Sequence, residues 1–170
     1  LEAYVSARAN SFSDLYAEAA MRLIAPNLRR AYAAPQDAAA RAAMMEGATL
    51  AGLAFSNSSV ALVHGMSRPI GAHFHVPHGV SNAMLLPAVT AFGLQAGLPR
   101  YAAAARVMGL ADTSTPDVEA GQSLLRELEA LNRELGVPTP REHGIDAARY
   151  ESLLPLMAEQ ALASGSPGNN

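Results

Sequence analysis

The spacing of apolar residues constrains the fold of this chain more than any other feature. Between residues 115 and 138, leucines recur every three or four positions, as they do along one face of a helix. Thr115 is a favoured N-cap residue, and Pro116 fits the first helical position. Gly136 followed by Pro138 is typical of a helix end. No stretch alternates with the period of two that marks a strand, so the sequence predicts an all-α, helical bundle-like domain.

Further helices are predicted from the same spacing, with prolines as breaks. They cover residues 13–32, 35–53, 60–68, 81–92 and 100–108, and a last one that starts at 146 and runs past 157. Ser13 is the expected N-cap of the first helix, and Pro26 is expected to kink or divide it. Pro69 is expected to end the third helix.

Two other local expectations concern packing and loops. The helix over residues 35–53 is rich in alanine and glycine, which lets another helix approach closely, so we expect a buried central helix there. Residues 74–79 and the tail from 164 to 170 are expected to be loops.

Composition excludes several classes of function. The net charge is -3 and aromatic residues make up only 5% of the chain, so a basic, aromatic nucleic-acid surface is not expected. All 12 basic residues are arginine, and the missing lysine excludes a Schiff-base nucleophile and a Walker loop. The absence of cysteine excludes a disulfide framework and thiolate ligands, and it permits a cytoplasmic location, which we expect. No run is long and apolar enough for a membrane span.

Four of the chain's 5 histidines lie between Val63 and Asn82, in the segment VHGMSRPIGAHFHVPHGVSN. Histidine is the side chain best suited to bind a borderline divalent metal or to transfer a proton near neutral pH. His64 falls on a predicted helix and His78 at the start of the next, which makes both candidate metal ligands. Ordinary buried histidines are commoner than ligands, and two imidazoles alone do not complete a site. His73 and His75, in an extended HFH segment, would share one side and frame a pocket.

Arg68 follows His64 by one helical turn and is the nearest cation in sequence. One interpretation is a surface arginine at a helix end. The other is an arginine that binds an anionic group, such as a carboxylate or a phosphate, beside the metal.

The segment HGMSRPIGAHFHVPHGVSNAMLLP resembles the signature of iron-dependent (group III) alcohol dehydrogenases, which reads HxxxHxxGxxxxxPHGxxNAxxLP. The flanking segments LEAYVSARANSFSDLYAEAAMRLI and RYAAAARVMG resemble the same family. The resemblance implies the all-helical C-terminal half of a two-domain, dehydroquinate-synthase-like fold. We expect residues 1–170 to form one metal-binding domain, truncated at both ends, whose N-terminal nucleotide-binding α/β domain is absent.

The resemblance also implies a metal site and a reaction. The first and last histidines of the signature, which are metal ligands in the family, fall on His64 and His78. The family's other two ligands, an Asp and a His, would precede Leu1. The ligands suit Fe²⁺ and Zn²⁺ equally, and the full-length protein would use NAD or NADP. The expected activity is hydride transfer between an alcohol and an aldehyde or ketone.

This chain departs from the family at Arg68, where many relatives carry a histidine that relays a proton. A guanidinium stays protonated, so we expect Arg68 to orient a carboxylate-bearing substrate and His73, His75 or water to carry the proton. Phe55 resembles an aromatic residue near the family's nicotinamide cleft, and core packing is its alternative role.

Other interpretations remain open. One alternative is that the chain alone is an inactive, stable helical fragment that binds only a partner or a loose metal. A relationship to glycerol dehydrogenases or maleylacetate reductases is a second alternative. The expected partners are a small alcohol or carbonyl compound and a second copy of the protein in a dimer, with no nucleic acid and no membrane.

Overall fold

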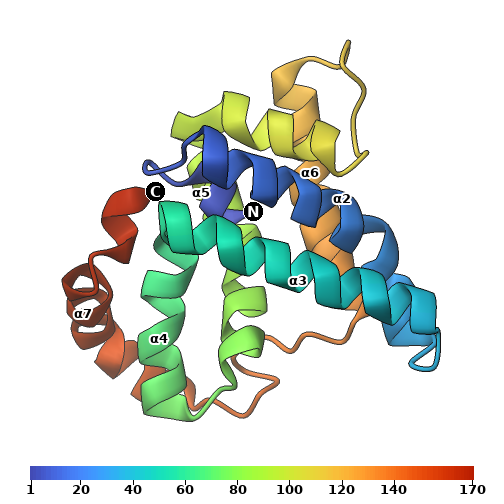
Figure 1. Cartoon of the computed structure of the whole chain (residues 1–170). Helices are drawn as coiled ribbons and strands as arrows, with labels where there is room; N and C mark the ends of the chain where they lie inside the picture. The colour runs from blue at the N-terminus through green and yellow to red at the C-terminus, as the bar shows by residue number, and fades with distance from the viewer.

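The molecule consists of helices that pack in two groups around a short N-terminal helix (Figure 1). The computed structural model describes residues 1–170. The elements are α1 (Glu2–Val5), α2 (Ser11–Ala33), α3 (Ala38–Ser58), α4 (Leu62–Phe74), α5 (His78–Val107), α6 (Asp117–Glu134), α7 (Ala147–Ala163) and the 3-10 helix η1 (Ser166–Asn169). No residue lies in a strand, and the prediction of an all-α fold is confirmed.

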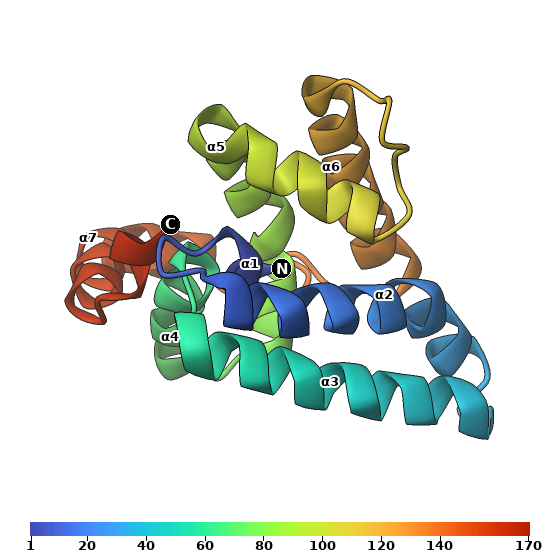
Figure 2. The same ribbon diagram turned by 45° about the horizontal axis from the view of Figure 1, so that its top comes forward.

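Two clusters of buried side chains hold the helices together. The larger joins α1, α2, α3, α5 and α6 and includes Tyr4, Met21, Tyr101 and Leu124. The smaller cluster joins helix α4 with helix α7 and with the segments beside these two helices. Figure 2 shows α2 and α3 side by side, with α5 and α6 across α2 from α3. The N-terminus therefore lies near the middle of the molecule, between these pairs.

The first long helix begins earlier than predicted, because Asn10 rather than Ser13 is its N-cap. Asn10 Oδ1 accepts hydrogen bonds from the backbone N of Phe12 at 3.1 Å and of Ser13 at 3.0 Å. Ser13 Oγ accepts one in return from Asn10 N at 2.9 Å, which completes a capping box. Asn10 Nδ2 also donates to Asn57 O at 3.0 Å, so the cap ties α2 to the end of α3.

Prolines interrupt the helices less than predicted. α2 continues through Pro26, and α4 continues through Pro69 to Phe74. Pro26 lies on the exposed face of α2, as does Arg22, so water can satisfy the Arg22 carbonyl that loses its helical partner. Pro69 is buried among neighbouring elements, whose packing outweighs the cost of the missing bond.

The two predicted helices over residues 81–92 and 100–108 form one element, α5, which is kinked at Gly97 (φ -110°, ψ 21°). Gly93 before the kink packs directly on Tyr101 after it. A Cβ atom at Gly93 would lie 2.3 Å from Tyr101 Oη, so only glycine allows this close approach. Burial raises the pKa of Tyr101 to about 12, and the charge of Glu2 adds to this increase.

The prediction of a buried central helix over residues 35–53 is wrong. The helix is α3, which starts after the N-cap Asp37, and Pro35 lies in the preceding turn. α3 packs on α2 through one face, where Gly47 contacts Ile24, while Met45 on another face is 71% exposed. Small side chains are spread all around α3, so they do not reveal which face is covered.

The expected loops are shorter than predicted. Only residues 75–77 separate α4 from α5, because His78 is already the first residue of α5. The tail forms η1 because Asn169 is anchored, its Nδ2 donating to Val60 O at 3.0 Å. Ala7 N donates to Asn169 O at 2.6 Å, which ties the last turn to the first residues.

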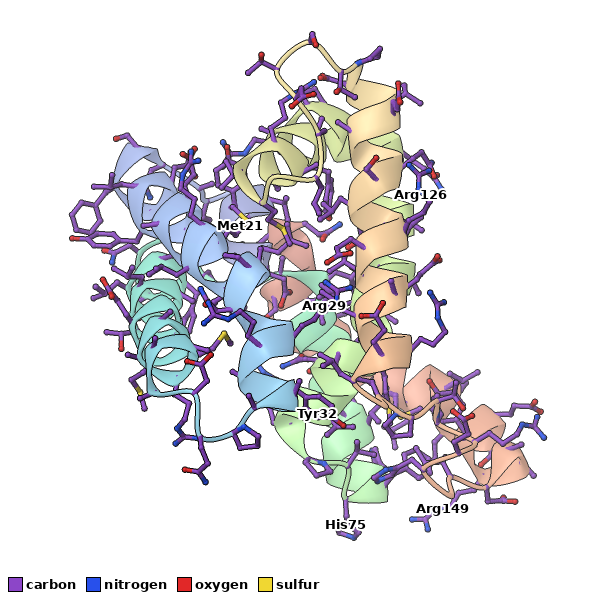
Figure 3. All side chains as sticks on the ribbon, turned by 90° about the vertical axis from the view of Figure 1, so that its right-hand side faces the viewer. Met21, Arg29, Tyr32, His75, Arg126 and Arg149 are labelled. Carbon is purple, nitrogen blue, oxygen red and sulfur yellow. The ribbon has the colours of Figure 1, made fainter.

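Arg29 joins α2 to α6 across the middle of the molecule (Figure 3). Its Nη1 and Nη2 donate to Glu127, and its Nε donates to Glu134. The hydrogen bond from Arg29 holds the pKa of Glu134 below its usual value. None of the helices is both long and apolar enough to span a membrane.

We expect Asn10→Ala to destabilise the fold by about 1 kcal/mol, because it removes the acceptor that caps α2. Urea denaturation measures the free energy of unfolding. Ser11→Ala is the matched control, because the Ser11 side chain, at the first helical position, makes no hydrogen bond. Equal effects of the two substitutions would contradict the role of the cap.

We expect Gly93→Ala to destabilise the fold by about 1–3 kcal/mol, because the new methyl group would displace the buried Tyr101 ring. Gly52→Ala is the control. No atom lies within 4 Å of a Cβ there, so it should stabilise the fold by about 0.5–1 kcal/mol through helix propensity. Thermal unfolding followed by circular dichroism ranks the two variants, and a stable Gly93→Ala protein would show that the kink does not depend on this contact.

Candidate metal centre

His64 and His78 lie next to each other where α4 and α5 begin. Their ring centroids are 5.1 Å apart, with the planes inclined at 65°. Asn82 Nδ2 lies 3.4 Å from Nε2 of His64 and 3.1 Å from Nε2 of His78. The two Nε2 atoms therefore face a common point. The structure thus places side by side the two histidines that the sequence predicts as metal ligands, and their role as ligands stays a prediction.

The backbone around the pair explains how histidines from two helices meet. Ser59, with φ 72°, ends α3 and redirects the chain into α4, so His64 falls in the first turn of α4. At the other end, His75 adopts a left-handed conformation (φ 56°) that stops α4. Pro77 then fixes the extended backbone that precedes α5 and places His78 at its first position.

Glu2 on α1 makes three polar contacts at the start of α4, two of them with His64. Its Oε1 accepts from the backbone N of Ala61 at 3.0 Å and of His64 at 3.2 Å. Its Oε2 forms a close contact with His64 Nδ1. Burial opposes ionisation of Glu2, but its hydrogen bonds with His64 and Ala61 lower its pKa below the usual value. Oε1 accepts from two backbone N–H groups at once, which suits a carboxylate, and a carboxylate can only accept hydrogen bonds.

An apolar cavity of about 430 Å³ opens beside the histidine pair. Leu1, Phe55, His64 and Asn82 line it, together with apolar residues of α2, α3, α5 and α6. Phe55 is 47% exposed, so it is not an ordinary core residue. The start of the chain, Phe55 and His64 thus share one cavity.

The donor atoms present fit two positions of a divalent metal site. Imidazole Nε2 atoms are common ligands of Fe²⁺ and Zn²⁺, and His64 and His78 present theirs toward one point. Asn82 Oδ1 is buried there without a hydrogen-bond partner. A buried amide oxygen normally has such a partner, so this position is a polar site that still lacks one. No group of three or more His, Cys, Asp or Glu in the chain is arranged to hold a metal.

His73 and His75 lie at the opposite end of α4 from His64. They line a separate polar pocket of about 250 Å³ with His143, Asp146 and Arg149. His73 Nε2 is 2.9 Å from Gln160 Oε1. Figure 3 shows His75 at the edge of the molecule, on the same side as Arg149. The structure does not bring either histidine to the His64–His78 pair.

Arg68 lies on α4 one turn beyond His64, and its side chain is exposed. Its Nη1 donates to Ser166 Oγ at 3.2 Å, and Ser166 is buried in η1. The remaining guanidinium donors of Arg68 make no contact with a carboxylate, so they are available to an anion.

Two residues of the site were missed by the sequence analysis. Glu2 is 62 residues from His64, and no spacing rule connects them. Its only signal was its place in the segment LEAY, which resembles the family's sequence. Asn82 belongs to the PHGxxNA part of the signature, and this position was the available signal for it.

These features outline a candidate divalent metal site, with two convergent histidines, in an all-helical domain. Residues 1–170 match the model of the Fe-containing alcohol dehydrogenase family, C-terminal part, and the chain belongs to this family. It is 37% identical, over all of its 170 residues, to 1,3-propanediol dehydrogenase from Klebsiella pneumoniae, of which it covers 43%. It is 42% identical over 154 residues to long-chain-alcohol dehydrogenase 1 from Geobacillus thermodenitrificans, covering 90% of this chain and 39% of that protein.

Solved structures agree with this assignment. The crystal structure of a 1,3-propanediol oxidoreductase superposes with a TM-score of 0.92 at 37% identity, over 99% of this chain and 44% of that one. An alcohol dehydrogenase from Oenococcus oeni gives 0.87 at 32% identity, over 99% of this chain and 43% of that one. The chain therefore spans less than half the length of the relatives that it matches.

Proposed function

We propose that this chain is the metal-binding domain of a two-domain, NAD(P)-linked oxidoreductase that interconverts an alcohol and an aldehyde or ketone. The observation that carries the proposal is the pair of convergent Nε2 atoms of His64 and His78 within the family signature. The relatives include 1,3-propanediol, long-chain-alcohol and lactaldehyde enzymes, and their names support a small alcohol or aldehyde as substrate.

The proposed metal is Fe²⁺ or Zn²⁺, held by His64 and His78 and by two ligands from a segment that precedes Leu1. Leu1 supports this arrangement because it lines the same cavity as His64, so a preceding segment would start beside the pair. Bound there, the ion would supply a Lewis acid that lowers the pKa of an alcohol and so favours hydride loss to the nicotinamide.

The other proposed roles belong to side chains around the pair. Phe55 would contact the nicotinamide from the rim of the cavity, and a separate N-terminal α/β domain would bind the rest of NAD or NADP. Arg68 would orient a carboxylate on the substrate. The proton would pass through water rather than through His73 or His75, because both histidines lie in the other pocket. We propose a dimer as the working assembly.

A second candidate is an inactive helical fragment, and one observation favours it for the 170-residue chain alone. The chain offers only two convergent histidines where a catalytic site needs at least three protein ligands. We therefore expect the isolated chain to bind little iron and to show no NAD(P)-linked alcohol oxidation. Measurable turnover by the isolated chain would contradict this expectation.

In the two-domain protein, we expect His64→Ala and His78→Ala each to lower kcat/KM by at least about 100-fold, because each removes a metal ligand. Metal content, measured by mass spectrometry after desalting, should fall in parallel. His143→Ala is the control, because His143 lies in the other pocket. Full metal content and activity in either of the first two variants would contradict the proposed site.

We expect Arg68→Ala to raise KM for a hydroxy acid by about tenfold and to leave KM for a neutral alcohol of the same length unchanged, because a charge-assisted hydrogen bond is worth about 1.5–3 kcal/mol. Arg41→Ala is the control, because Arg41 is exposed on α3 and makes no ion pair. Steady-state kinetics with the two substrates checks the prediction. An equal loss for both would show that Arg68 does not recognise a carboxylate.

A further inference from the structure

Glu2 makes two kinds of contact with α4, one through each carboxylate oxygen. Oε1 accepts from the backbone N–H groups of Ala61 and His64. These groups belong to the first turn of α4, whose N-cap residue Ala61 has no side chain able to cap it. Oε2 contacts only the ring atom His64 Nδ1. The contact that caps α4 and the contact with the imidazole therefore use different oxygens of the carboxylate and different partner groups.

The contact at Oε2 determines which ring nitrogen of His64 carries the hydrogen. Because the Glu2 carboxylate has no hydrogen to donate, Nδ1 must be the donor, and Nε2 of the neutral ring keeps its lone pair. Asn82 agrees with this tautomer, since its Nδ2 group donates and lies 3.4 Å from that Nε2. The ring is held at both nitrogens, and its lone pair faces the Asn82 amide, which also lies beside Nε2 of His78.

Glu2 itself is held in place by the fold. Its side chain is only 13% exposed, and its three contacts leave it little freedom to rotate. It reaches α4 from α1, whose residues Ala3 and Tyr4 are buried in the larger core cluster. A rigid carboxylate on the far side of an imidazole is the arrangement that fixes the orientation of metal-binding histidines and raises their basicity.

We propose that Glu2 is a positioning residue for the metal centre: it locks His64 in the Nδ1–H tautomer with Nε2 aimed at the point shared with His78. This inference rests on the proposed function, because the proposed metal site is what gives the tautomer a purpose. The tautomer itself can be observed without metal. A role limited to capping α4 would leave the tautomer free.

The first test is the tautomer of His64 in the metal-free two-domain protein. Long-range ¹H–¹⁵N spectra of histidine-labelled protein, recorded well above the imidazole pKa, separate the two neutral tautomers. His64→Gln identifies the signal by its loss. We expect Nδ1–H in the wild type. In Glu2→Gln the amide nitrogen can replace Oε2 and donate to Nδ1, so we expect a change to Nε2–H.

Each outcome of the first test decides the inference. The expected change of tautomer supports it. An Nε2–H ring in the wild type overturns it, and so does an unchanged Nδ1–H ring in Glu2→Gln. If Glu2→Gln fails to fold, the wild-type spectrum still decides, because only the Nδ1–H ring agrees with the inference.

The second test is the affinity for Zn²⁺, measured by competition with a chromophoric chelator. We expect Glu2→Gln to bind about 10- to 100-fold more weakly than the wild type, as is typical when a carboxylate behind a metal-binding histidine is lost. Asp37→Asn is the control, because Asp37 also caps a helix through its carboxylate but lies away from the cavity.

The two tests separate the inference from the proposed function. Equal Zn²⁺ affinity in wild type and Glu2→Gln would overturn the positioning role. Absence of Zn²⁺ binding in the wild type, together with the expected tautomers, would refute the proposed metal site and show that Glu2 orients His64 for another purpose.

Discussion

The contact between Glu2 and the first turn of α4 is the interaction on which the candidate site depends. It joins segments 62 residues apart and acts on the backbone and on the ring of the same histidine. The backbone contacts satisfy two groups at a helix start that has no side-chain cap of its own. The ring contact orients His64 toward His78. A single buried carboxylate thus connects the fold of α4 to the chemistry of the site.

The remaining architecture brings the two ends of this contact together. Arg100 holds α1 in place through Tyr4. The Arg100 guanidinium lies 3.7 Å from the ring centroid of Tyr4 and donates to the backbone carbonyl of Tyr4. The same guanidinium also forms an ion pair with Asp14. α1 is consequently fixed against α2 and α5 although it is only 4 residues long. His78 is positioned from the other side, where the left-handed His75 and Pro77 set the short connection between α4 and α5.

The sequence predicted the helical class because that class depends on local, strongly patterned signals, and it identified the two candidate histidines for the same reason. The helix after Pro116 was recognised from its leucine spacing, and His64 with His78 from the family signature. The continuity of α4 through Pro69 was missed, because burial of Pro69 among neighbouring elements is a tertiary effect that overrides propensity. The exposure of one face of α3 was also missed, since a helix of small residues has no apolar stripe to read. Glu2 was missed because its partner is distant in sequence.

Anomalous X-ray diffraction tests the central claim most directly. Crystals of the two-domain protein loaded with Fe²⁺ or Zn²⁺ would be measured on both sides of the absorption edge of the metal. The account predicts one strong anomalous peak, about 2.1 Å from Nε2 of both His64 and His78. A peak that contacts neither histidine, or one bonded to Nδ1 of His64, would contradict it.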